Sequence, residues 1–223
     1  MVIDDGAPVD NLHSEREMRL LVQSLYDSWK PSRPFVAMAN VGLFSSPTEP
    51  PFVPDVLVSL DASFPNTGSK TDQTYCTWVY QKPPDLVVEI VSNKEGHEER
   101  KIEGYARLGI GYYVIHDPKK LLSKRELRVY ELHGRRYVEV LNPSWLPQLE
   151  LGVCLRWGEF QSYEASYLRW TDAQGRVLEI GADRADQEQA RAEQEKARAE
   201  QERARAERLA SRLRELGLEE EQP

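Results

Sequence analysis

The apolar positions in the N-terminal part of the chain follow two different periods. Between residues 12 and 29 they recur every three or four residues, which predicts an amphipathic helix. These positions are Met18, Leu21, Val22, Leu25 and Trp29. Ser14 and Glu17 have the spacing of a capping box, which would mark the start of this helix. Residues 35–43 and 53–60 are short apolar runs next to prolines, and each run predicts a strand.

The middle of the chain alternates strand patterns with helix patterns. Residues 85–91 form an apolar run that predicts a buried central strand. Residues 95–108 have helical spacing, and Gly109 directly after them is a typical helix stop. Residues 112–116 predict another strand, and residues 126–141 predict a hairpin. This alternation predicts an α/β fold with a mixed central sheet flanked by helices.

The remaining parts of this region have weaker patterns. Residues 61–84 are polar and irregular, which predicts a long loop. Residues 151–155 and 176–180 are short apolar runs, and we expect two further strands there.

Alanine, glutamate, glutamine and arginine dominate the chain from Ala182 onward. Residues 191–197 and 198–204 form a seven-residue repeat of strong helix formers, so we expect a long charged helix. A coiled coil needs large apolar residues at two core positions of each repeat. In the best register one position holds alanine and the other holds Glu195 and Glu202, which favours a solvated helix over a coiled coil. The helix would have an apolar end formed by Leu209, Leu213 and Leu216.

These patterns divide the 223 residues into three parts. Residues 1–181 are expected to form one domain, since this length can bury a substantial core. Residues 182–217 are expected to form a helix that is either solvent-exposed or part of a coiled coil. Residues 218–223 are expected to be a disordered acidic tail.

The composition limits the classes of function. The net charge of −8 disfavours a nucleic-acid partner unless basic residues gather locally, as Lys101 and Arg107 could on one helix. The two cysteines, Cys76 and Cys154, show neither disulfide-framework nor zinc-finger spacing. Residues 1–6 lack the pattern of a signal peptide, and no apolar stretch approaches the ~18 residues of a membrane span. We therefore expect a cytoplasmic protein without a membrane partner.

One acid stands inside the most apolar strand pattern. Burying the carboxylate of Glu89 without a partner would cost several kcal/mol, so we expect it to have a chemical role. Asp55 lies near the start of a neighbouring predicted strand, and Lys101 lies on the following predicted helix. Two carboxylates close together repel each other unless a divalent cation lies between them, and Mg²⁺ prefers such oxygen ligands. Two acids and a lysine in this order indicate a metal-dependent phosphodiesterase.

Each of these residues also has a structural alternative when taken alone. Pro54-Asp55 is a common turn at the start of a strand, Glu89 could pair with a buried arginine, and Lys101 could be an ordinary surface lysine. The four histidines show no metal-ligand spacing, and we expect no role for them. They are His13, His97, His116 and His133. Tyr105 is expected to pack in the core.

The matching segments resemble the PD-(D/E)XK, or restriction-endonuclease-like, superfamily, and within it the Uma-two family of small endonucleases. The segments are Pro54-Asp55-Val56, residues 84–92, Lys101, Tyr105-Ala106, Gly109 and residues 112–118. The resemblance covers roughly residues 12–160 and is most specific from Glu89 to Pro118. It implies a restriction-endonuclease-like core followed by a long C-terminal charged helix.

The resemblance also implies roles for individual residues. Asp55 and Glu89 match the two motif acids and, with the Ile90 carbonyl, would hold the metal. The motif lysine normally stands two residues after the acid, where this chain has Val91, and Lys101 matches its relocated position on the next helix. We expect the two carboxylates to lie within about 6 Å of each other, with the Lys101 amine in the same pocket. The superfamily also tends to place an acid on its first helix, where Glu17 is an accessory candidate. Asp85, which follows a proline, is a second accessory candidate and an alternative to Asp55; because only four residues separate it from Glu89, we expect it to have a turn or supporting role.

By the same resemblance the protein would be an endonuclease that uses Mg²⁺ or Mn²⁺ to hydrolyse phosphodiester bonds of its substrate, DNA. The alternative is an inactive nuclease fold that serves as a binding or assembly module and docks a protein partner through its C-terminal helix. A homodimer of the core is also expected, because most soluble oligomers are symmetric homo-oligomers.

Overall fold

The computed structural model describes residues 11–66, 68–94 and 97–215. The chain divides into two compact units, with the boundary between Glu179 and Ile180. The first unit contains an α/β fold, and the second contains the long C-terminal helix.

The first unit is built on a mixed six-stranded sheet with the strand order β1-β3-β5-β6-β7-β8. Strands β5 and β6 are parallel, and all the other neighbouring pairs of this sheet are antiparallel. The strands are β1 (Phe35–Ala39), β3 (Val56–Leu60), β5 (Leu86–Ile90), β6 (Tyr112–His116), β7 (Leu127–His133) and β8 (Arg136–Glu139). The predicted α/β class, mixed central sheet and hairpin are confirmed.

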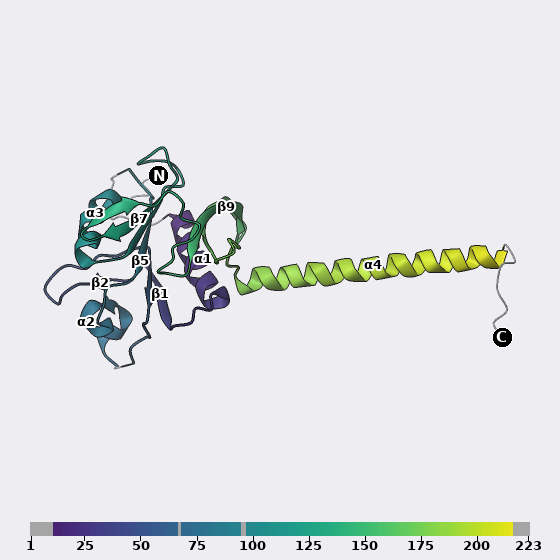
Figure 1. Ribbon diagram of the computed structural model, residues 1–223, viewed down its shortest axis with the longest axis horizontal. Helices are drawn as coiled ribbons and strands as arrows, with labels where there is room; N and C mark the ends of the chain where they lie inside the picture. Colours follow the sequence, from purple (N-terminus) through teal and green to yellow (C-terminus); the bar gives the residue numbers. More distant parts are fainter. Residues whose placement is uncertain (1–10, 67, 95–96, 216–223) are drawn as a thin grey trace, which may run out of the picture. The chain divides into compact units, whose positions relative to one another are not determined.

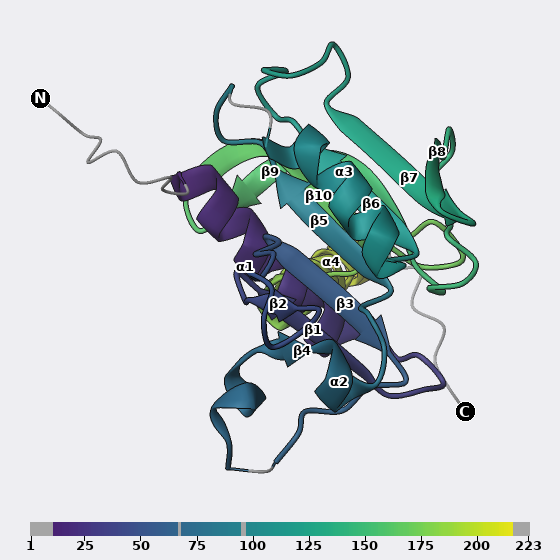
Figure 2. The same cartoon turned by 90° about the vertical axis from the view of Figure 1, so that its left-hand side faces the viewer.

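Two helices lie on opposite sides of this sheet (Figures 1 and 2). They are α1 (Leu12–Ser28) and α3 (His97–Leu108). Because successive side chains of a strand point to opposite faces, each strand contributes to two cores. Val88 of β5 belongs to the core beneath α1, whereas Val87 belongs to the core with Tyr105 of α3.

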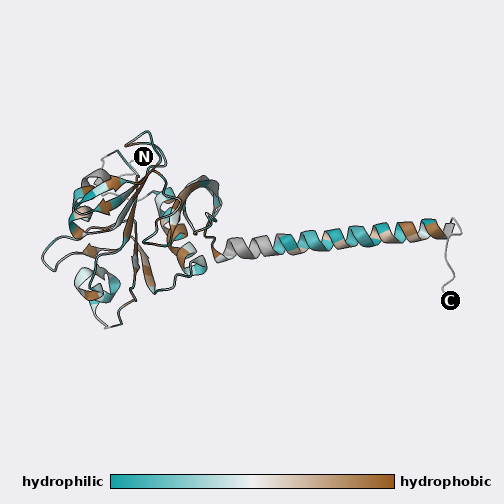
Figure 3. Ribbon diagram, viewed as in Figure 1, coloured by the Kyte–Doolittle hydropathy of each residue, from teal (hydrophilic) through white to brown (hydrophobic). Residues whose placement is uncertain are grey.

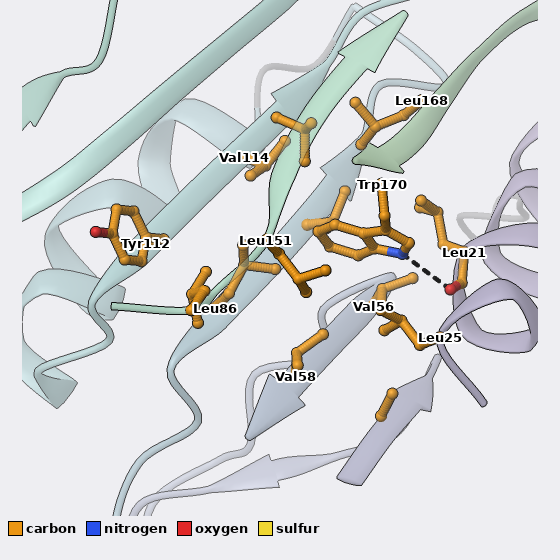
Figure 4. Close-up of a cluster of buried hydrophobic side chains, with 14 of the residues drawn as sticks. Leu21, Leu25, Val56, Val58, Leu86, Tyr112, Val114, Leu151, Leu168 and Trp170 are labelled. Carbon is orange, nitrogen blue, oxygen red and sulfur yellow. Dashed lines mark hydrogen bonds between the residues drawn. The ribbon is translucent and has the colours of Figure 1, made fainter. Parts of the chain in front are cut away.

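The core beneath α1 is closed by a hairpin that the sequence predicted only in part. This hairpin consists of β9 (Gly152–Phe160) and β10 (Tyr163–Thr171). Trp170 of β10 is fully buried and donates its indole N–H to the Leu21 carbonyl of α1 at 2.9 Å (Figure 4). The hairpin therefore fixes α1 against the sheet.

Three local predictions were wrong. The helix cap is Asn11, whose side chain accepts hydrogen bonds from the amides of His13 and Ser14, so there is no Ser14–Glu17 capping box. Residues 176–180 form no strand; Val177 makes only an isolated bridge with Thr171. The region from 61 to 84 contains three short elements in place of a structureless loop. They are η1 (Lys70–Gln73), β4 (Tyr75–Cys76) and α2 (Thr77–Tyr80), and β4 pairs in parallel with β2 (Leu43–Phe44).

The second unit contains the helix α4 (Gly181–Glu215). Most of it is hydrophilic, and apolar residues appear near its C-terminal end (Figure 3). Leu209 and Leu213 are 55% and 48% exposed. Leu216 and the tail 218–223 lie outside the described residues. Within the described part of the chain, no helix combines the length and apolar character that crossing a membrane requires.

Candidate active site

The sheet register brings the two predicted motif acids together. Strand β3 runs antiparallel to β5 and pairs Val56 with Val88, so one further step of this register places Asp55 opposite Glu89. Residues directly opposite each other on antiparallel strands project from the same face of the sheet. Asp55 is 9% exposed and Glu89 is 3% exposed. Two almost completely buried acids therefore lie side by side on the face covered by α3.

Asp55 is also tied to the backbone of β5. Its Oδ2 accepts a hydrogen bond from the Ile90 amide at 2.5 Å. This contact brings the main chain of Ile90, whose carbonyl is a predicted metal ligand, next to the Asp55 carboxylate.

Glu89 receives two hydrogen bonds from α3. Lys101 Nζ lies 2.7 Å from Glu89 Oε2, and the Tyr105 hydroxyl donates to Glu89 Oε1 at 2.5 Å. Lys101 and Tyr105 are four residues apart, so they lie on the same face of the helix. The Lys101 amine also donates to the Val53 carbonyl at 3.3 Å, and the Lys101 side chain remains 26% exposed. The Lys101 side chain thus contacts the buried Glu89 carboxylate and is itself partly exposed to solvent.

Tyr105 has a second role besides the expected core packing. Burial, followed by the negative charges of Glu89 and Asp55, raises the pKa of Tyr105 well above its ordinary value. The phenol therefore stays protonated and acts as a permanent hydrogen-bond donor to Glu89. Phe52 packs on the Tyr105 ring with 5.0 Å between ring centroids. A side chain at Gly104 would place its Cβ 2.5 Å from the Phe52 ring, so any larger residue there would force the ring to move away from its present position.

The accessory candidate Asp85 does not belong to this cluster. It precedes the first residue of β5, whereas Glu89 is near the last. Its Oδ2 accepts hydrogen bonds from the Leu60 amide at 2.8 Å and from Lys82 Nζ at 2.6 Å. Asp85 therefore joins the end of β3 to the turn before β5.

The other accessory candidate, Glu17, lies on the opposite face of the sheet, beneath α1. Its Oε2 is 2.8 Å from His116 Nδ1 and 3.5 Å from His13 Nε2. Its Oε1 accepts a hydrogen bond from the Leu168 amide. His13 is 7% exposed, and Glu17 and His116 are completely buried. We call these three side chains, His13, Glu17 and His116, the α1-face cluster.

In the α1-face cluster, Glu17 and His116 favour their charged forms and make a buried ion pair. Burial alone would raise the pKa of Glu17, but the charge and hydrogen bond of His116, with a smaller contribution from His13, hold it below its ordinary value. Burial alone would lower the pKa of His116, but Glu17 and then Glu126 raise it. We expected no role for His13 and His116, but the structure brings them together with Glu17, and one donor atom from each of the three residues lies within 4.8 Å of the others.

The α3 face offers carboxylate oxygens, the donor type that hard cations prefer. The two carboxylates carry two negative charges and Lys101 carries one positive charge, so a divalent ion would be attracted to the site. The structure brings together Asp55, Glu89 and Lys101, whereas Glu17 and Asp85 lie elsewhere. The predicted 6 Å limit between the two carboxylates stays a prediction.

A comparison with known protein families found a match over most of the chain. A family model described as "Uma2: Putative restriction endonuclease" matches residues 3–161 of the chain. This range contains the whole six-stranded sheet, α1 and α3. No curated protein matched the chain.

Proposed function

Because the chain belongs to the Uma2 family, whose model carries the description "Putative restriction endonuclease", we propose that it is a divalent-metal-dependent endonuclease that hydrolyses phosphodiester bonds of DNA. The observation that carries this proposal is the environment of Glu89. This carboxylate is buried, lies next to Asp55 in the sheet register and is bonded to a lysine that reaches solvent.

The donor atoms of this site fit Mg²⁺ or Mn²⁺. Asp55 and Glu89 offer carboxylate oxygens, and we propose the Ile90 carbonyl as a further ligand. Hard oxygen donors of this kind suit Mg²⁺ and Mn²⁺, which keep several water molecules when bound by one or two carboxylates. When bound, the ion would polarise the scissile phosphate and lower the pKa of a water molecule.

The protein residues would then position and neutralise the reacting groups. As a water oxygen attacks phosphorus and one P–O bond breaks, negative charge grows on the phosphate oxygens. The Lys101 amine lies beside Glu89 and is partly open to solvent, so it can donate to such an oxygen and stabilise that charge. Tyr105 holds Oε1 of Glu89 in a fixed orientation.

Basic residues on the α3 side of the sheet favour DNA as the substrate. Toward the C-terminal end of α3, a cavity of about 680 Å³ between this helix and the β7–β8 hairpin is lined by Arg107, Arg135 and Arg136, with Glu103 as an acidic residue of the lining. Guanidinium groups bind phosphate oxygens in a bidentate manner, and phosphate contacts provide most of the non-specific affinity for DNA. This local positive charge can offset the negative net charge of the chain.

Cleavage of supercoiled plasmid in Mg²⁺ or Mn²⁺ tests the proposal. The wild-type protein should nick and linearise the plasmid, and Asp55→Asn, Glu89→Ala and Lys101→Ala should each slow cleavage by at least about a hundredfold. The matched control is Asp85→Asn, which changes an acid beside the same strand and should leave the rate unchanged. Equal cleavage by all variants would remove this mechanism. No cleavage by the wild-type protein with either ion would favour the binding module instead.

A further inference from the structure

The α1-face cluster has the donor set of a transition-metal site. Two imidazole nitrogens and a carboxylate oxygen converge within 4.8 Å of one another. We propose that His13, Glu17 and His116 bind a Zn²⁺-type transition-metal ion, at a site separate from the acids of the α3 face. The ion would join α1 to the end of β6.

Two of the three distances within the cluster are close to those between ligands of one ion. Zinc binds nitrogen and oxygen donors at about 2.0–2.2 Å, so the ligand atoms of a tetrahedral site lie about 3.3–3.5 Å apart. Glu17 Oε2 is 2.8 Å from His116 Nδ1 and 3.5 Å from His13 Nε2. All three ligand atoms lie within 4.8 Å of one another, so adjustments of the side chains would bring them around one ion.

One ligand atom is buried without satisfying its hydrogen-bonding capacity. Within the described part of the chain, His13 Nε2 makes no hydrogen bond and has only the 3.5 Å contact with Glu17 Oε2, although the residue is only 7% exposed. Buried polar atoms normally have a partner, and an exception calls for an explanation such as an ion. A metal bound to His13 Nε2 and Glu17 Oε2 would provide one.

Neighbouring groups orient the ligands as they do in metal centres. Ligating histidines generally direct their other ring nitrogen to a carboxylate or carbonyl. Here Glu126 Oε1 faces His116 Nε2 on the side of the ring away from Glu17, at 3.6 Å, which is an ion-pair distance and longer than a hydrogen bond. The other oxygen of Glu17, Oε1, accepts a hydrogen bond from the Leu168 amide. The His13 ring stacks on the Tyr167 ring with 5.3 Å between the ring centroids.

The donor types select the metal. Imidazole suits Zn²⁺ and other first-row transition ions, whereas Mg²⁺ and Ca²⁺ prefer oxygen alone. The two faces of the sheet would thus bind different ions, a transition metal beneath α1 and Mg²⁺ or Mn²⁺ beneath α3.

Cobalt binding to the untagged, metal-stripped full chain tests the site, because Co²⁺ bound to imidazole absorbs visible light. We expect one equivalent of Co²⁺ to give this absorption, Zn²⁺ to abolish it by competition, and Zn²⁺ to raise the melting temperature. An Asp55→Ala/Glu89→Ala double variant should keep the absorption. Because that variant lacks the acids of the α3 face, this result does not depend on nuclease activity.

Two single variants identify the ligands. His13→Ala should weaken Co²⁺ binding by at least about a hundredfold, since even changes outside the ligand set reduce affinity by tenfold to a hundredfold. His133→Ala is the matched control, because this histidine is exposed on the β7–β8 hairpin and should bind no ion. The proposal is overturned by the absence of cobalt absorption in the unmodified chain, by its loss in the double variant, or by equal affinity in His13→Ala. The measurements on the unmodified chain and on the double variant leave His13, Glu17 and His116 unchanged. They therefore test the proposed metal site even if the His13→Ala protein does not fold.

Discussion

The two faces of the central sheet each contain a buried glutamate. A comparison of the two shows that burial of a carboxylate does not by itself indicate its function. Glu89 is 3% exposed and Glu17 is 0% exposed. Glu89 is bonded to Lys101, whose side chain is 26% exposed, whereas Glu17 is bonded to His116, which is completely buried. We call Glu89, Lys101 and Tyr105 the α3-face group; of the two glutamates, Glu89 is the one whose charged partner reaches solvent. The access of a carboxylate's partner to solvent, rather than the burial of the carboxylate, distinguishes the two faces.

The largest expected effect concerns the α1 face. Glu17→Gln removes one charge of a completely buried ion pair, so the free energy of unfolding should fall by about 3–5 kcal/mol. The folded fraction should cleave plasmid at the wild-type rate, because Glu17 lies on the other side of the sheet from Glu89. Urea denaturation in the presence of a chelator measures the free energy of unfolding without a contribution from bound metal. A variant that is fully folded but inactive would place Glu17 in the catalytic machinery after all.

On the α3 face we expect a loss of activity with little loss of stability. Glu89→Gln keeps the shape of the side chain and one acceptor oxygen, which can serve Lys101 or Tyr105 but not both, and it removes the negative charge proposed to hold the metal. The rate of plasmid cleavage should fall by about a hundredfold to a thousandfold, with a much smaller change in melting temperature than Glu17→Gln produces. Cleavage rates and melting curves of the two variants, measured side by side, test the comparison directly. If Glu89→Gln unfolds the protein while keeping activity, the assignment of the two faces is inverted.

Tyr105→Phe sharpens the comparison within the α3 face. It removes the hydrogen bond to Glu89 Oε1 and leaves the aromatic packing on Phe52 in place. Loss of such an orienting contact should slow cleavage about tenfold, and a higher Mn²⁺ concentration should restore part of the rate. A purely structural tyrosine would lower the melting temperature without changing the metal dependence.

The smallest effect is expected from removing the tail. A 1–181 protein should keep its melting temperature and its cleavage rate, because the described residues of α4 are largely exposed. Self-association measured by sedimentation should decrease, since the exposed Leu209 and Leu213 are lost. A Leu209→Asp variant of the full chain is the matched control and should show the same decrease. A drop in melting temperature of many degrees on truncation would mean that α4 is part of the fold.

The α3-face group was predictable because its signals are local in sequence. Glu89 stands in a continuous apolar strand, and Lys101 and Tyr105 follow on the next helix with a spacing of four residues. The alternation of strand, helix and strand from residue 86 to residue 116 also defined the centre of the fold. The role of Tyr105 could have been inferred from this spacing, because residues four apart share one face of a helix.

The α1-face cluster and the second hairpin were not predictable in the same way. His13 and Glu17 are one helical turn apart, but His116 is 99 residues from Glu17 and meets it only when α1 packs on the sheet. Strand β9 exposes Arg156 and Trp157, so its apolar pattern ends after a few residues. The predicted capping box does not form. Asn11 caps the helix, and the Glu17 side chain points into the core, where it contacts His116.

The strand order has a consequence for the course of folding. Glu89, Lys101 and Tyr105 belong to one continuous β5–α3–β6 segment, which can form from neighbouring residues. Asp55 reaches Glu89 only when β3, separated from β5 by the region from 61 to 84, has joined the sheet. Contacts between distant residues form late because closing a long loop loses chain entropy. A partly folded chain would thus carry the lysine and one acid without the second acid, and hydrolytic activity would arise only as the native topology is completed.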